Sequence, residues 1–451
     1  MQDRYTSAAL ISRGEFRCGC GKTHRAHLQA AVVERGAVRR LSEFTKKLGG
    51  TNAYMIADKN TYAAAGRQAE ETLRANGVRV TTYIYPENRT EPDEKAVGAA
   101  FLHRPADCDI LVAVGSGVMN DIMKIVALAT KLPFIVVGTA PSMDGYASST
   151  SSVIRDKLKV SVDSACPNVI LGDIDILEKA PKHMLLAGLG DMLAKYISVC
   201  EWRIGNVVTG EYYCEEVAAI IRAALKKCVD NADGLLTGSE EAVRAVMDGL
   251  IVSGIAADYA GVSRPVSGVE HYFSHIWDMR ALEFGTPFDL HGVQCGVGSL
   301  YALKGYEKLR TLTPDALCAN AAFAAFDAET WQEELRRYLG SAAQGMIENV
   351  KNSVRYDAGK HAARLHNLVS RWPEILRIID EELPAYEAVL SLLRRIGAPT
   401  APADFGLDNA DAPKVFAMTR DIRDKYILST LAFDLGILDT IAAQMTPPAQ
   451  Q

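Results

Sequence analysis

Two histidines four residues apart, His271 and His275, lie in the apolar segment SGVEHYFSHIWDM. Residues i and i+4 share one face of an α-helix, so the two imidazoles would project together. A third imidazole, His291, opens the segment HGVQCGVG, and Asp191 places a carboxylate in the apolar segment AGLGDMLAKYIS. Two imidazoles and one carboxylate with a position open for substrate are typical of a catalytic site for a divalent metal.

Each of these side chains also has an ordinary structural interpretation. An H-x-x-x-H pair on an amphipathic helix is as often packed and hydrogen-bonded as it is bound to a metal. An aspartate in a helical segment can serve only as a cap. The spacing alone therefore leaves both metal binding and packing open.

A glycine turn supplies a second group of candidates. In DILVAVGSGVMNDIMK, an apolar strand ends in the turn Gly115-Ser116-Gly117, and a helix begins near Val118. Glycine lets the backbone approach a ligand, and free amides at a helix N-terminus suit a pyrophosphate. The pattern differs from the usual G-x-G-x-x-G fingerprint, because its sixth position is Asn120 and it follows the third predicted strand. A tight turn without a ligand is the alternative.

The next predicted strand ends in a loop of small and hydroxyl residues, VGTAPSMDGYASSTSS. Ligands of open α/β sheets bind at the carboxyl ends of strands. Thr139, Ser142 and Ser148 are therefore candidates for hydrogen bonds to a cofactor, and Asp144 is a candidate acceptor for substrate hydroxyls. Asp58, which closes the strand YMIAD, is a candidate for a cofactor ribose. The alternatives are a solvated loop and a surface turn aspartate.

The elements that must position these residues change character along the chain. Up to about residue 175, short apolar runs alternate with helical segments, which predicts a doubly wound, Rossmann-like parallel sheet. The predicted strands are 53–58, 79–85, 109–115 and 134–138, and the predicted helices are 61–77, 93–103 and 120–131. After Pro181 only helical patterns remain, over 183–203, 211–233, 239–259, 267–280, 331–349, 373–395 and 413–443. We therefore predict a nucleotide-binding α/β domain over 1–175 and an all-α metal- and substrate-binding domain over 176–451.

Composition excludes several classes of protein. The chain has 451 residues, a net charge of −6 and a pI near 5.9, which argue against a nucleic-acid or anionic-membrane partner. No uninterrupted apolar run of about 18 residues is present, and the N-terminus lacks the apolar core of a signal peptide. The nine cysteines show no regular framework. We therefore expect a cytoplasmic protein with reduced cysteines.

The N-terminal segment FRCGCGKTHRAH contains Cys18, Cys20, His24 and His27, which suggests a zinc site. A structural zinc site usually pairs C-x-x-C with a second, well-separated pair of ligands. Here the spacing is C-x-C, and no second cluster follows. The sequence therefore favours a glycine turn in an N-terminal hairpin over metal binding.

Five motifs in order carry a resemblance to a known family: VGSGVMNDIMK, TAPSMDGYASSTSS, GLGDMLAK, SRPVSGVEHYFSH and HGVQCGVG. Together they resemble the iron-containing alcohol dehydrogenase and dehydroquinate synthase-like superfamily, and most closely the bacterial sn-glycerol-1-phosphate dehydrogenases. The similarity runs from about residue 30 to 300. It implies a nucleotide-binding α/β domain and a helical domain, with the active site in the cleft between them.

The resemblance also implies a role for each candidate residue. Asp191, His271 and His291 would bind one divalent ion, zinc, nickel or iron, and His275 would act as a substrate or proton-relay residue. Asp144 would contact substrate. The implied cofactor contacts run from Gly115 to Asp121, with Ser116, Gly117 and Asn120 between them, and include Thr139, Ser142 and Ser148. Asp58 mildly favours NAD over NADP, because a carboxylate repels a 2′-phosphate.

The implied reaction interconverts dihydroxyacetone phosphate and sn-glycerol 1-phosphate, so a small phosphorylated substrate needs a cationic ligand. We expect Arg264 in GVSRPVSG to bind this phosphate, because a guanidinium forms two hydrogen bonds to it. A structural ion pair with a nearby carboxylate is the alternative, and Lys124, Lys157 and Lys195 are weaker candidates. A homodimer is expected for an enzyme of this size.

Two other activities compete with this one. A dehydrogenase for glycerol or another simple alcohol would need no phosphate ligand. A lyase similar to dehydroquinate synthase would use its cofactor only transiently, and in that branch glutamate usually stands where this chain has Asp191.

Overall fold

The computed structural model describes residues 2–87, 90–155 and 158–447. The chain folds into two compact units, which we name the sheet unit (Met1–Met192 and Glu216–Val262) and the helical unit (Leu193–Glu215 and Ser263–Gln451). This division differs from the predicted boundary at residue 175. The reason is that α10 (Glu240–Ala260), which we assigned to the helical domain, packs against β3 (Ala30–Glu34) and α1 (Ser7–Arg13).

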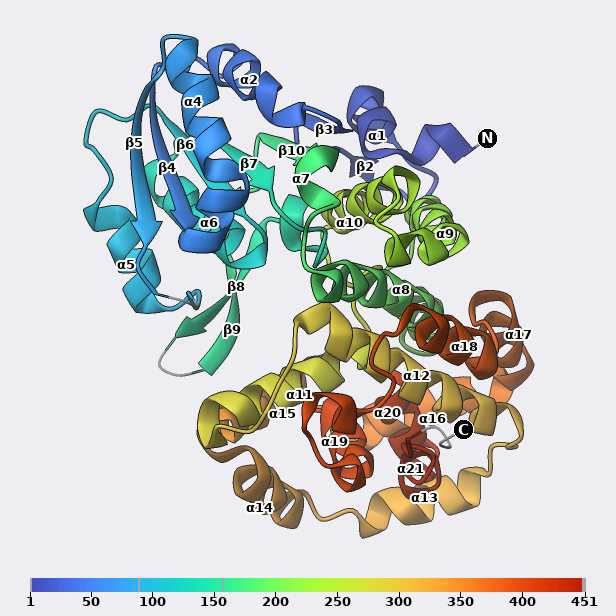
Figure 1. Cartoon of the computed structure of the whole chain (residues 1–451). Helices are drawn as coiled ribbons and strands as arrows, with labels where there is room; N and C mark the ends of the chain where they lie inside the picture. The colour runs from blue at the N-terminus through green and yellow to red at the C-terminus, as the bar shows by residue number, and fades with distance from the viewer. Residues whose placement is uncertain (1, 88–89, 156–157, 448–451) are drawn as a thin grey trace. The chain divides into compact units, whose positions relative to one another are not determined.

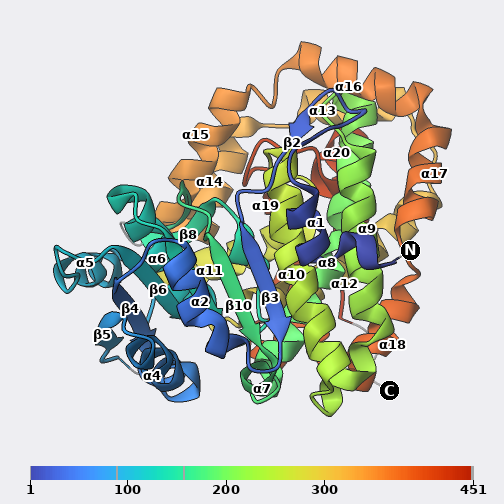
Figure 2. The ribbon, with the colours of Figure 1, turned by 90° about the horizontal axis from the view of Figure 1, so that it is seen from above.

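A six-stranded parallel sheet forms the centre of the sheet unit, in the order β3-β10-β7-β6-β4-β5 (Figures 1 and 2). Its other strands are β4 (Asn52–Asp58), β5 (Arg79–Tyr85), β6 (Ile110–Gly115), β7 (Phe134–Gly138) and β10 (Val169–Asp173). The predicted fold class is confirmed, and all four predicted strands are present within one residue of their predicted bounds. Strands β3 and β10 were not predicted.

The strand order sets the place where a ligand can bind. The strands β5-β4-β6-β7-β10 follow the 2-1-3-4-5 order of doubly wound sheets, so the winding direction reverses between β4 and β6. Gly115 at the end of β6 is level with Gly138 at the end of β7. Asp58 ends β4. The predicted cofactor residues therefore lie at the carboxyl edge on either side of the switch point, where ligands of such sheets bind.

Both faces of this sheet are covered, as parallel strands require. On one face, Met55 and Val112 belong to an apolar cluster with Leu41 of α2 (Leu41–Lys47) and Leu73 of α4 (Arg67–Ala75). On the other face, α6 (Gly117–Thr130) packs against β4 and β6. Burying a side chain such as Leu73 stabilises the fold by roughly 1.5–3 kcal/mol.

The remaining elements of the sheet unit are shorter. They are β1 (Phe16–Arg17), β2 (Thr23–His24), η2 (Ala37–Arg40), α3 (Lys59–Thr61), the π-helical turn η3 (Tyr62–Gly66), α5 (Glu94–Leu102), η4 (Gly145–Ala147), β8 (Thr150–Arg155), β9 (Leu158–Asp163), α7 (Ile174–Leu177), α9 (Glu215–Asp230) and η5 (Ala232–Leu236), with η1 (Gln2–Tyr5) at the N-terminus. Two antiparallel hairpins, β1–β2 and β8–β9, stand apart from the main sheet.

Only helices occur among the described residues of the helical unit, which confirms the predicted all-α class. The long helix α8 (Lys182–Thr209) ends in it, and then follow α11 (Val269–Phe284), α12 (His291–Arg310), α13 (Ala316–Ala325), α14 (Ala328–Leu339), η6 (Gly340–Ala342), α15 (Ala343–Ser353), α16 (Ala358–Ser370), α17 (Trp372–Glu382), α18 (Tyr386–Ile396), η7 (Pro402–Phe405), η8 (Asn409–Asp411), α19 (Ala412–Thr419), α20 (Leu428–Asp434) and α21 (Leu438–Ala442). None of the helices in the described part of the chain has the length and apolar character needed to span a bilayer.

Some predicted helices are divided in the structure. The predicted helix 331–349 is divided at Gly340, whose φ of 59° interrupts the α conformation. The predicted helix 373–395 is divided at Leu383, which is extended (φ −101°, ψ 128°) because it precedes Pro384. Helix α12 was not predicted.

Candidate functional site

The turn between β6 and α6 has the backbone that a pyrophosphate site needs. Ser116 precedes the first residue of α6 and makes no side-chain capping hydrogen bond, so the first amides of the helix are left without a cap from it. A Cβ at Gly115 would lie 2.6 Å from Cγ of Met119, so only glycine fits there. At Gly117 the nearest atoms to a Cβ would belong to Met143, the first at an ordinary 3.4 Å. The turn thus combines uncapped amides with a bare backbone, which suits an anion.

The loop after β7 is held next to this turn by main-chain and side-chain contacts. The amide of Thr139 donates to the carbonyl of Gly115 at 3.1 Å. Asn120, which is fully buried, donates from Nδ2 to the carbonyl of Gly145 at 3.2 Å. Ser142 and Thr139 are both buried. The structure therefore brings the two predicted cofactor segments together, and it uses Asn120 to join them.

Ser148 and Asp121 lie around the buried lysine of α6. Lys124 donates to Oγ of Ser148 at 2.9 Å and to the carbonyl of Gly145, and its Nζ lies 3.7 Å from a carboxylate oxygen of Asp121. Burial raises the pKa of Asp121 to about 6, although Lys124 opposes this shift. Lys124, a weaker candidate for binding the substrate phosphate, thus makes its contacts with residues of the sheet unit. Lys157, another such candidate, lies outside the described residues.

Asp58 caps a helix. Its Oδ1 accepts a hydrogen bond from the amide of Thr61 at 2.8 Å, and Oγ1 of Thr61 accepts one from the amide of Asp58 at 3.0 Å. This reciprocal pair is a capping box that starts α3 directly after β4. Asp58 thus has a structural role at the edge where its ribose contact was predicted, and that contact stays a prediction.

Asp144 and Asp191, the two predicted acidic site residues, lie side by side in the sheet unit. The amide of Asp144 donates to Oδ2 of Asp191 at 2.9 Å, and Oγ of Ser253 donates to Oδ2 of Asp144 at 3.1 Å. Asp191 is fully buried in α8, whereas Asp144 is half-buried. The hydrogen bond from the amide of Asp144 orients the Asp191 carboxylate.

In the helical unit, α11 and α12 pack against each other and bring two of the predicted metal ligands together. The rings of His271 and His291 are 5.0 Å apart between centroids. A Cβ at Gly298 of α12 would lie 2.6 Å from the carbonyl oxygen of Glu270, so this glycine permits the close approach of the two helices. The ligand atoms of His271, His291 and Cys295 all lie within 4.8 Å of one another, a spacing suited to binding one metal ion.

Both imidazoles are oriented by neighbours. Oε1 of Glu270 lies 2.8 Å from Nδ1 of His271, and Oγ of Ser274 lies 2.8 Å from Nδ1 of His291. With Nδ1 beside an oxygen, each ring would bind a metal through Nε2, and such Nδ1 partners are typical of histidine ligands. Burial raises the pKa of Glu270, and the amide of Gly268, 2.7 Å from the same Oε1, opposes this shift.

His275 lies on the same side of α11 as His271, as the i, i+4 spacing predicts. Its ring is 6.0 Å from the ring of His291 and 5.9 Å from the ring of Tyr272. His275 is half-buried, whereas His271 is buried. The three predicted histidines therefore form one group in the helical unit.

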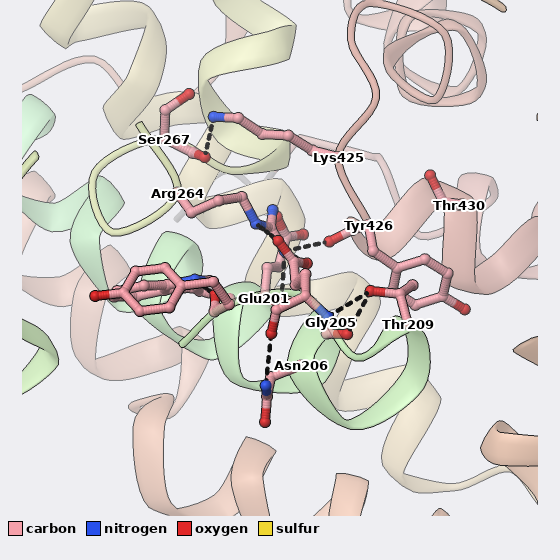
Figure 3. A network of polar contacts seen from close by, with 12 residues as sticks. Glu201, Gly205, Asn206, Thr209, Arg264, Ser267, Lys425, Tyr426 and Thr430 are labelled. Atoms are coloured by element: carbon pink, nitrogen blue, oxygen red, sulfur yellow. Dashed lines mark hydrogen bonds and ion pairs between the residues drawn. The ribbon is translucent and has the colours of Figure 1, made fainter. Parts of the chain in front are cut away.

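Arg264 lies in a buried polar network, and the structure shows the ion pair that was its alternative role (Figure 3). Its Nε and Nη2 donate to the two carboxylate oxygens of Glu211 at 2.8 and 2.7 Å, and Nη2 also donates to the carbonyls of Glu201 and Tyr426. Its side chain is 5% exposed. These contacts occupy Nε and Nη2 of Arg264, and its assignment as the phosphate ligand stays a prediction. Lys195, a weaker candidate, is fully buried and donates to the carbonyl of Val266 at 3.0 Å.

Replacing Arg264 by alanine is therefore expected to destabilise the fold. The change leaves the carboxylate of Glu211 without its cation, which should lower the free energy of unfolding by about 3 kcal/mol in urea titrations. The Michaelis constants for phosphorylated and unphosphorylated substrates should rise by similar factors. As a matched control, the double variant Arg264→Met with Glu211→Leu should recover most of the lost stability. A stable Arg264→Ala variant with weakened binding of the phosphorylated substrate alone would support the phosphate assignment instead.

Three side chains in or next to the histidine group were missed in the sequence. Glu270 is adjacent to His271, but its role depends on the rotamer that returns its carboxylate to Nδ1. Cys295 lies one helical turn after His291 in HGVQCGVG, and its Sγ is 3.5 Å from Nε2 of that histidine. Lys425 donates to the carbonyl of Ser267 at 2.9 Å (Figure 3). Its Nζ lies 5.7 Å from the ring centre of Tyr272. The H-x-x-x-C spacing was the only local signal for any of them.

Comparison with known proteins identifies the family of the chain. The family described as iron-containing alcohol dehydrogenase matches residues 32–181. A glycerol-1-phosphate dehydrogenase [NAD(P)+] of Bacillus licheniformis is 31% identical over 425 residues, which are 93% of this chain and 93% of that relative. The enzyme of the same name from Halalkalibacterium halodurans is 33% identical over 303 residues, 65% of this chain and 76% of the relative. The one from Methanosarcina mazei is 35% identical over 271 residues, 60% and 74% of the two chains.

Solved structures share the fold. A glycerol dehydrogenase from Schizosaccharomyces pombe matches with a TM-score of 0.60 at 17% identity, over 93% of this chain and 90% of its own. A 1,3-propanediol oxidoreductase matches with a TM-score of 0.59 at 17% identity, over 93% and 97%. At this identity the structures support the architecture alone, and the more similar sequences specify the group within it. The chain belongs to the family of glycerol-1-phosphate dehydrogenases, within the iron-containing alcohol dehydrogenases.

Proposed function

We propose that this protein is a metal-dependent oxidoreductase that interconverts dihydroxyacetone phosphate and sn-glycerol 1-phosphate with NAD or NADP. In the reducing direction, the ketone takes a hydride from NAD(P)H on carbon and a proton on oxygen, which gives the alcohol and NAD(P)⁺. The observation that carries the proposal is the oriented pair of His271 and His291, in a chain that matches a relative of that name over 93% of both lengths.

We propose Asp191, His271 and His291 as the ligands of one divalent ion, zinc, nickel or iron(II). The residues fit such an ion because both imidazoles have a partner on Nδ1 and Asp191 accepts an amide hydrogen bond that orients its carboxylate. Cys295 is a further donor beside the histidines, and a soft thiolate suits the same three metals. A bound divalent ion would supply a Lewis acid for the substrate oxygen.

The remaining roles are assigned to the chain's own groups. The uncapped amides after Gly115-Ser116-Gly117 would bind the cofactor pyrophosphate, and the neighbouring Thr139 and Ser142 would contact its nicotinamide half. His275 is the proposed proton relay, because it is half-buried and one helical turn from His271. Asp144 would accept a hydrogen bond from a substrate hydroxyl. We also propose that the protein is a homodimer and is located in the cytoplasm.

The proposal is tested by chelation and metal re-addition. Chelator treatment is expected to abolish NADH oxidation with dihydroxyacetone phosphate, because the ketone oxygen then lacks its Lewis acid. Activity should return on addition of zinc, nickel or iron(II), each added alone. Dihydroxyacetone without phosphate is the control substrate, and its kcat/KM should be far lower than that of the phosphorylated ketone.

Three outcomes would contradict the proposed activity. Undiminished activity after complete removal of metal would exclude the metal-dependent mechanism. Equal turnover of the two substrates would indicate a simple-alcohol dehydrogenase. A reaction that proceeds without net oxidation of NADH would indicate a lyase of the dehydroquinate synthase type.

A further inference from the structure

A loop of the helical unit brings two cations close to the histidine group. It has the sequence RDIRDKYI, covers residues 420–427 between α19 and α20, and supplies Arg423 and Lys425. Two of the cations predicted for the substrate phosphate are already engaged elsewhere. Arg264 is in an ion pair, and Lys195 is fully buried and donates to a main-chain carbonyl. A phosphorylated substrate needs a cation beside its reacting carbon, so the loop is the place to look for one.

Buried contacts fix the main chain of this loop. Asp421 is fully buried and accepts a hydrogen bond from Nε1 of Trp331 at 2.6 Å. The carbonyl of Arg423 accepts from Nη2 of Arg355 at 2.6 Å and from the amide of Lys425 at 2.9 Å. The backbone from which Lys425 extends is therefore held before any ligand arrives, which lowers the entropic cost of binding one.

Lys425 is directed at the chain that leads into α11. Its Nζ donates to the carbonyl of Ser267 at 2.9 Å (Figure 3) and to the carbonyl of Ser263 at 3.4 Å. Among the described residues, this ammonium forms no ion pair with a carboxylate. An ammonium has three N–H donors, so two bonds to neutral carbonyls leave a third donor for a ligand. Lys425 is half-buried.

The electrostatic surroundings of this ammonium favour an anion. Burial lowers the pKa of Lys425 well below its usual value, and the charges of Arg264 and Arg423 lower it further. Glu270 and Glu201 oppose the shift, but each acts less strongly than either arginine. A bound anion would keep the ammonium charged, because an opposite charge favours the protonated form.

Tyr272 lies between this ammonium and the proposed proton relay. Its ring centre is 5.7 Å from Nζ of Lys425 and 5.9 Å from the ring of His275. Its hydroxyl is buried and has no hydrogen-bond partner among the described residues. Burial raises the pKa of Tyr272, and Arg423 is the strongest of the charges that oppose this shift, so the hydroxyl lies near that guanidinium. A buried donor without an acceptor, close to cations, is suited to an anion.

We propose that Lys425 and Tyr272 bind the phosphate group of the substrate, with Arg423 as a second positive charge; this assignment rests on the proposed function. Lys425 would act as a point charge and Tyr272 as a hydrogen-bond donor. Dihydroxyacetone phosphate has only one methylene group and one ester oxygen between its carbonyl carbon and its phosphorus. Its carbonyl and phosphate must therefore bind close together, and Tyr272 lies beside His275, the proposed proton relay for that carbonyl.

The test compares kcat/KM for dihydroxyacetone phosphate with kcat/KM for dihydroxyacetone in the metal-loaded, full-length protein. The ratio of the two should fall roughly 10- to 100-fold in Lys425→Ala, the usual effect of losing a hydrogen bond to a charged group. Lys425→Arg keeps the charge and should retain more of the ratio. Lys360→Ala is the matched control, because Lys360 also donates to a carbonyl at 2.9 Å but is exposed on α16. An unchanged ratio in Lys425→Ala, or an equal fall in Lys360→Ala, would overturn the proposal.

Tyr272→Phe removes only the hydroxyl. Because that hydroxyl has no partner among the described residues, the variant should unfold at no lower urea concentration than the wild type. Its ratio of kcat/KM values should nevertheless fall by about tenfold, as expected for one lost hydrogen bond to the phosphate. A less stable variant with an unchanged ratio would show that the hydroxyl serves the fold and not the substrate.

Calorimetric titration with inorganic phosphate measures the same site without turnover. The protein would be saturated with NADH, which covers the proposed pyrophosphate turn. The wild type is expected to bind phosphate in competition with dihydroxyacetone phosphate, and Lys425→Ala to bind it at least about tenfold more weakly. Equal phosphate binding by the two proteins would overturn the site. A wild type that binds phosphate through Lys425 but does not reduce dihydroxyacetone phosphate would contradict the proposed dehydrogenase function alone, so the two failures are distinguishable.

Discussion

Replacing His271 by alanine is expected to lower kcat/KM for the reduction of dihydroxyacetone phosphate by roughly a thousandfold, because a Lewis acid on the substrate oxygen is worth several kcal/mol of transition-state stabilisation. The variant should bind NADH with an unchanged Kd, since the cofactor residues lie on other elements. Steady-state kinetics with saturating metal would measure the first effect, and a fluorescence titration with NADH the second.

Two further variants locate the cause of this loss. His366→Ala is the matched control, because His366 is an exposed histidine of α16 and its removal should leave kcat/KM unchanged. Glu270→Gln keeps the shape of the group beside Nδ1 of His271 but weakens its acceptor, so a 10- to 100-fold loss that excess metal partly restores is expected. If His271→Ala retained the metal and more than a tenth of the activity, the assignment of His271 as a ligand would be wrong.

Strands of the sheet could be predicted where a continuous apolar run in the sequence indicates a buried strand. ILVAV and FIVV are continuous apolar runs, and the structure buries both strands completely on both faces. Strand β3 carries no such signal, because it lies at the edge of the sheet and only Val32 is buried. Helix α12 was missed because HGVQCGVG is rich in glycine, which lowers helix propensity. Its Gly298 is required by packing against α11, a tertiary reason that local propensity does not contain.

In the candidate site too, features with a local sequence pattern were predicted, and features that depend on distant contacts were not. The glycine turn after β6 and the i, i+4 pair of histidines are local patterns, and the structure shows both as predicted. The ion pair of Arg264 with Glu211 joins residues 53 positions apart, so the sequence showed an available guanidinium where the fold has a neutralised one. Local motifs thus predict which groups are present, and the fold determines which of them are already in use.

The single methyl group added in Gly188→Ala is expected to lower both the stability of the sheet unit and the activity of the enzyme. A Cβ at Gly188 would lie 1.9 Å from the carbonyl oxygen of Pro141 and 2.8 Å from Cγ1 of Val246. The first contact is with backbone, so rotation of a side chain does not relieve it and the loop after β7 must move away from α8. Overpacking of this kind typically lowers the free energy of unfolding by about 1–3 kcal/mol.

The displaced loop carries the residues that the reaction needs. It runs from Thr139 to Asp144, and the amide of Asp144 donates to Asp191, one turn after Gly188 in α8. A shift of about 1 Å in such positioning groups costs on the order of a hundredfold in rate, so kcat/KM should fall by at least that factor. Metal content should fall as well, because Asp191 loses the hydrogen bond that orients it.

Gly98→Ala is the matched control for this variant. A Cβ at Gly98 of α5 meets nothing within 4 Å, so alanine there should raise the free energy of unfolding by up to about 1 kcal/mol through its better helix propensity. Urea unfolding, metal analysis and kcat/KM would be measured for both variants. Opposite effects on stability would show that the space at Gly188, and not a general cost of replacing helical glycine, holds the loop in place. Equal stability and activity of the two variants would mean that the loop accommodates the methyl group, and that its contact with α8 does not position Asp144 and Asp191.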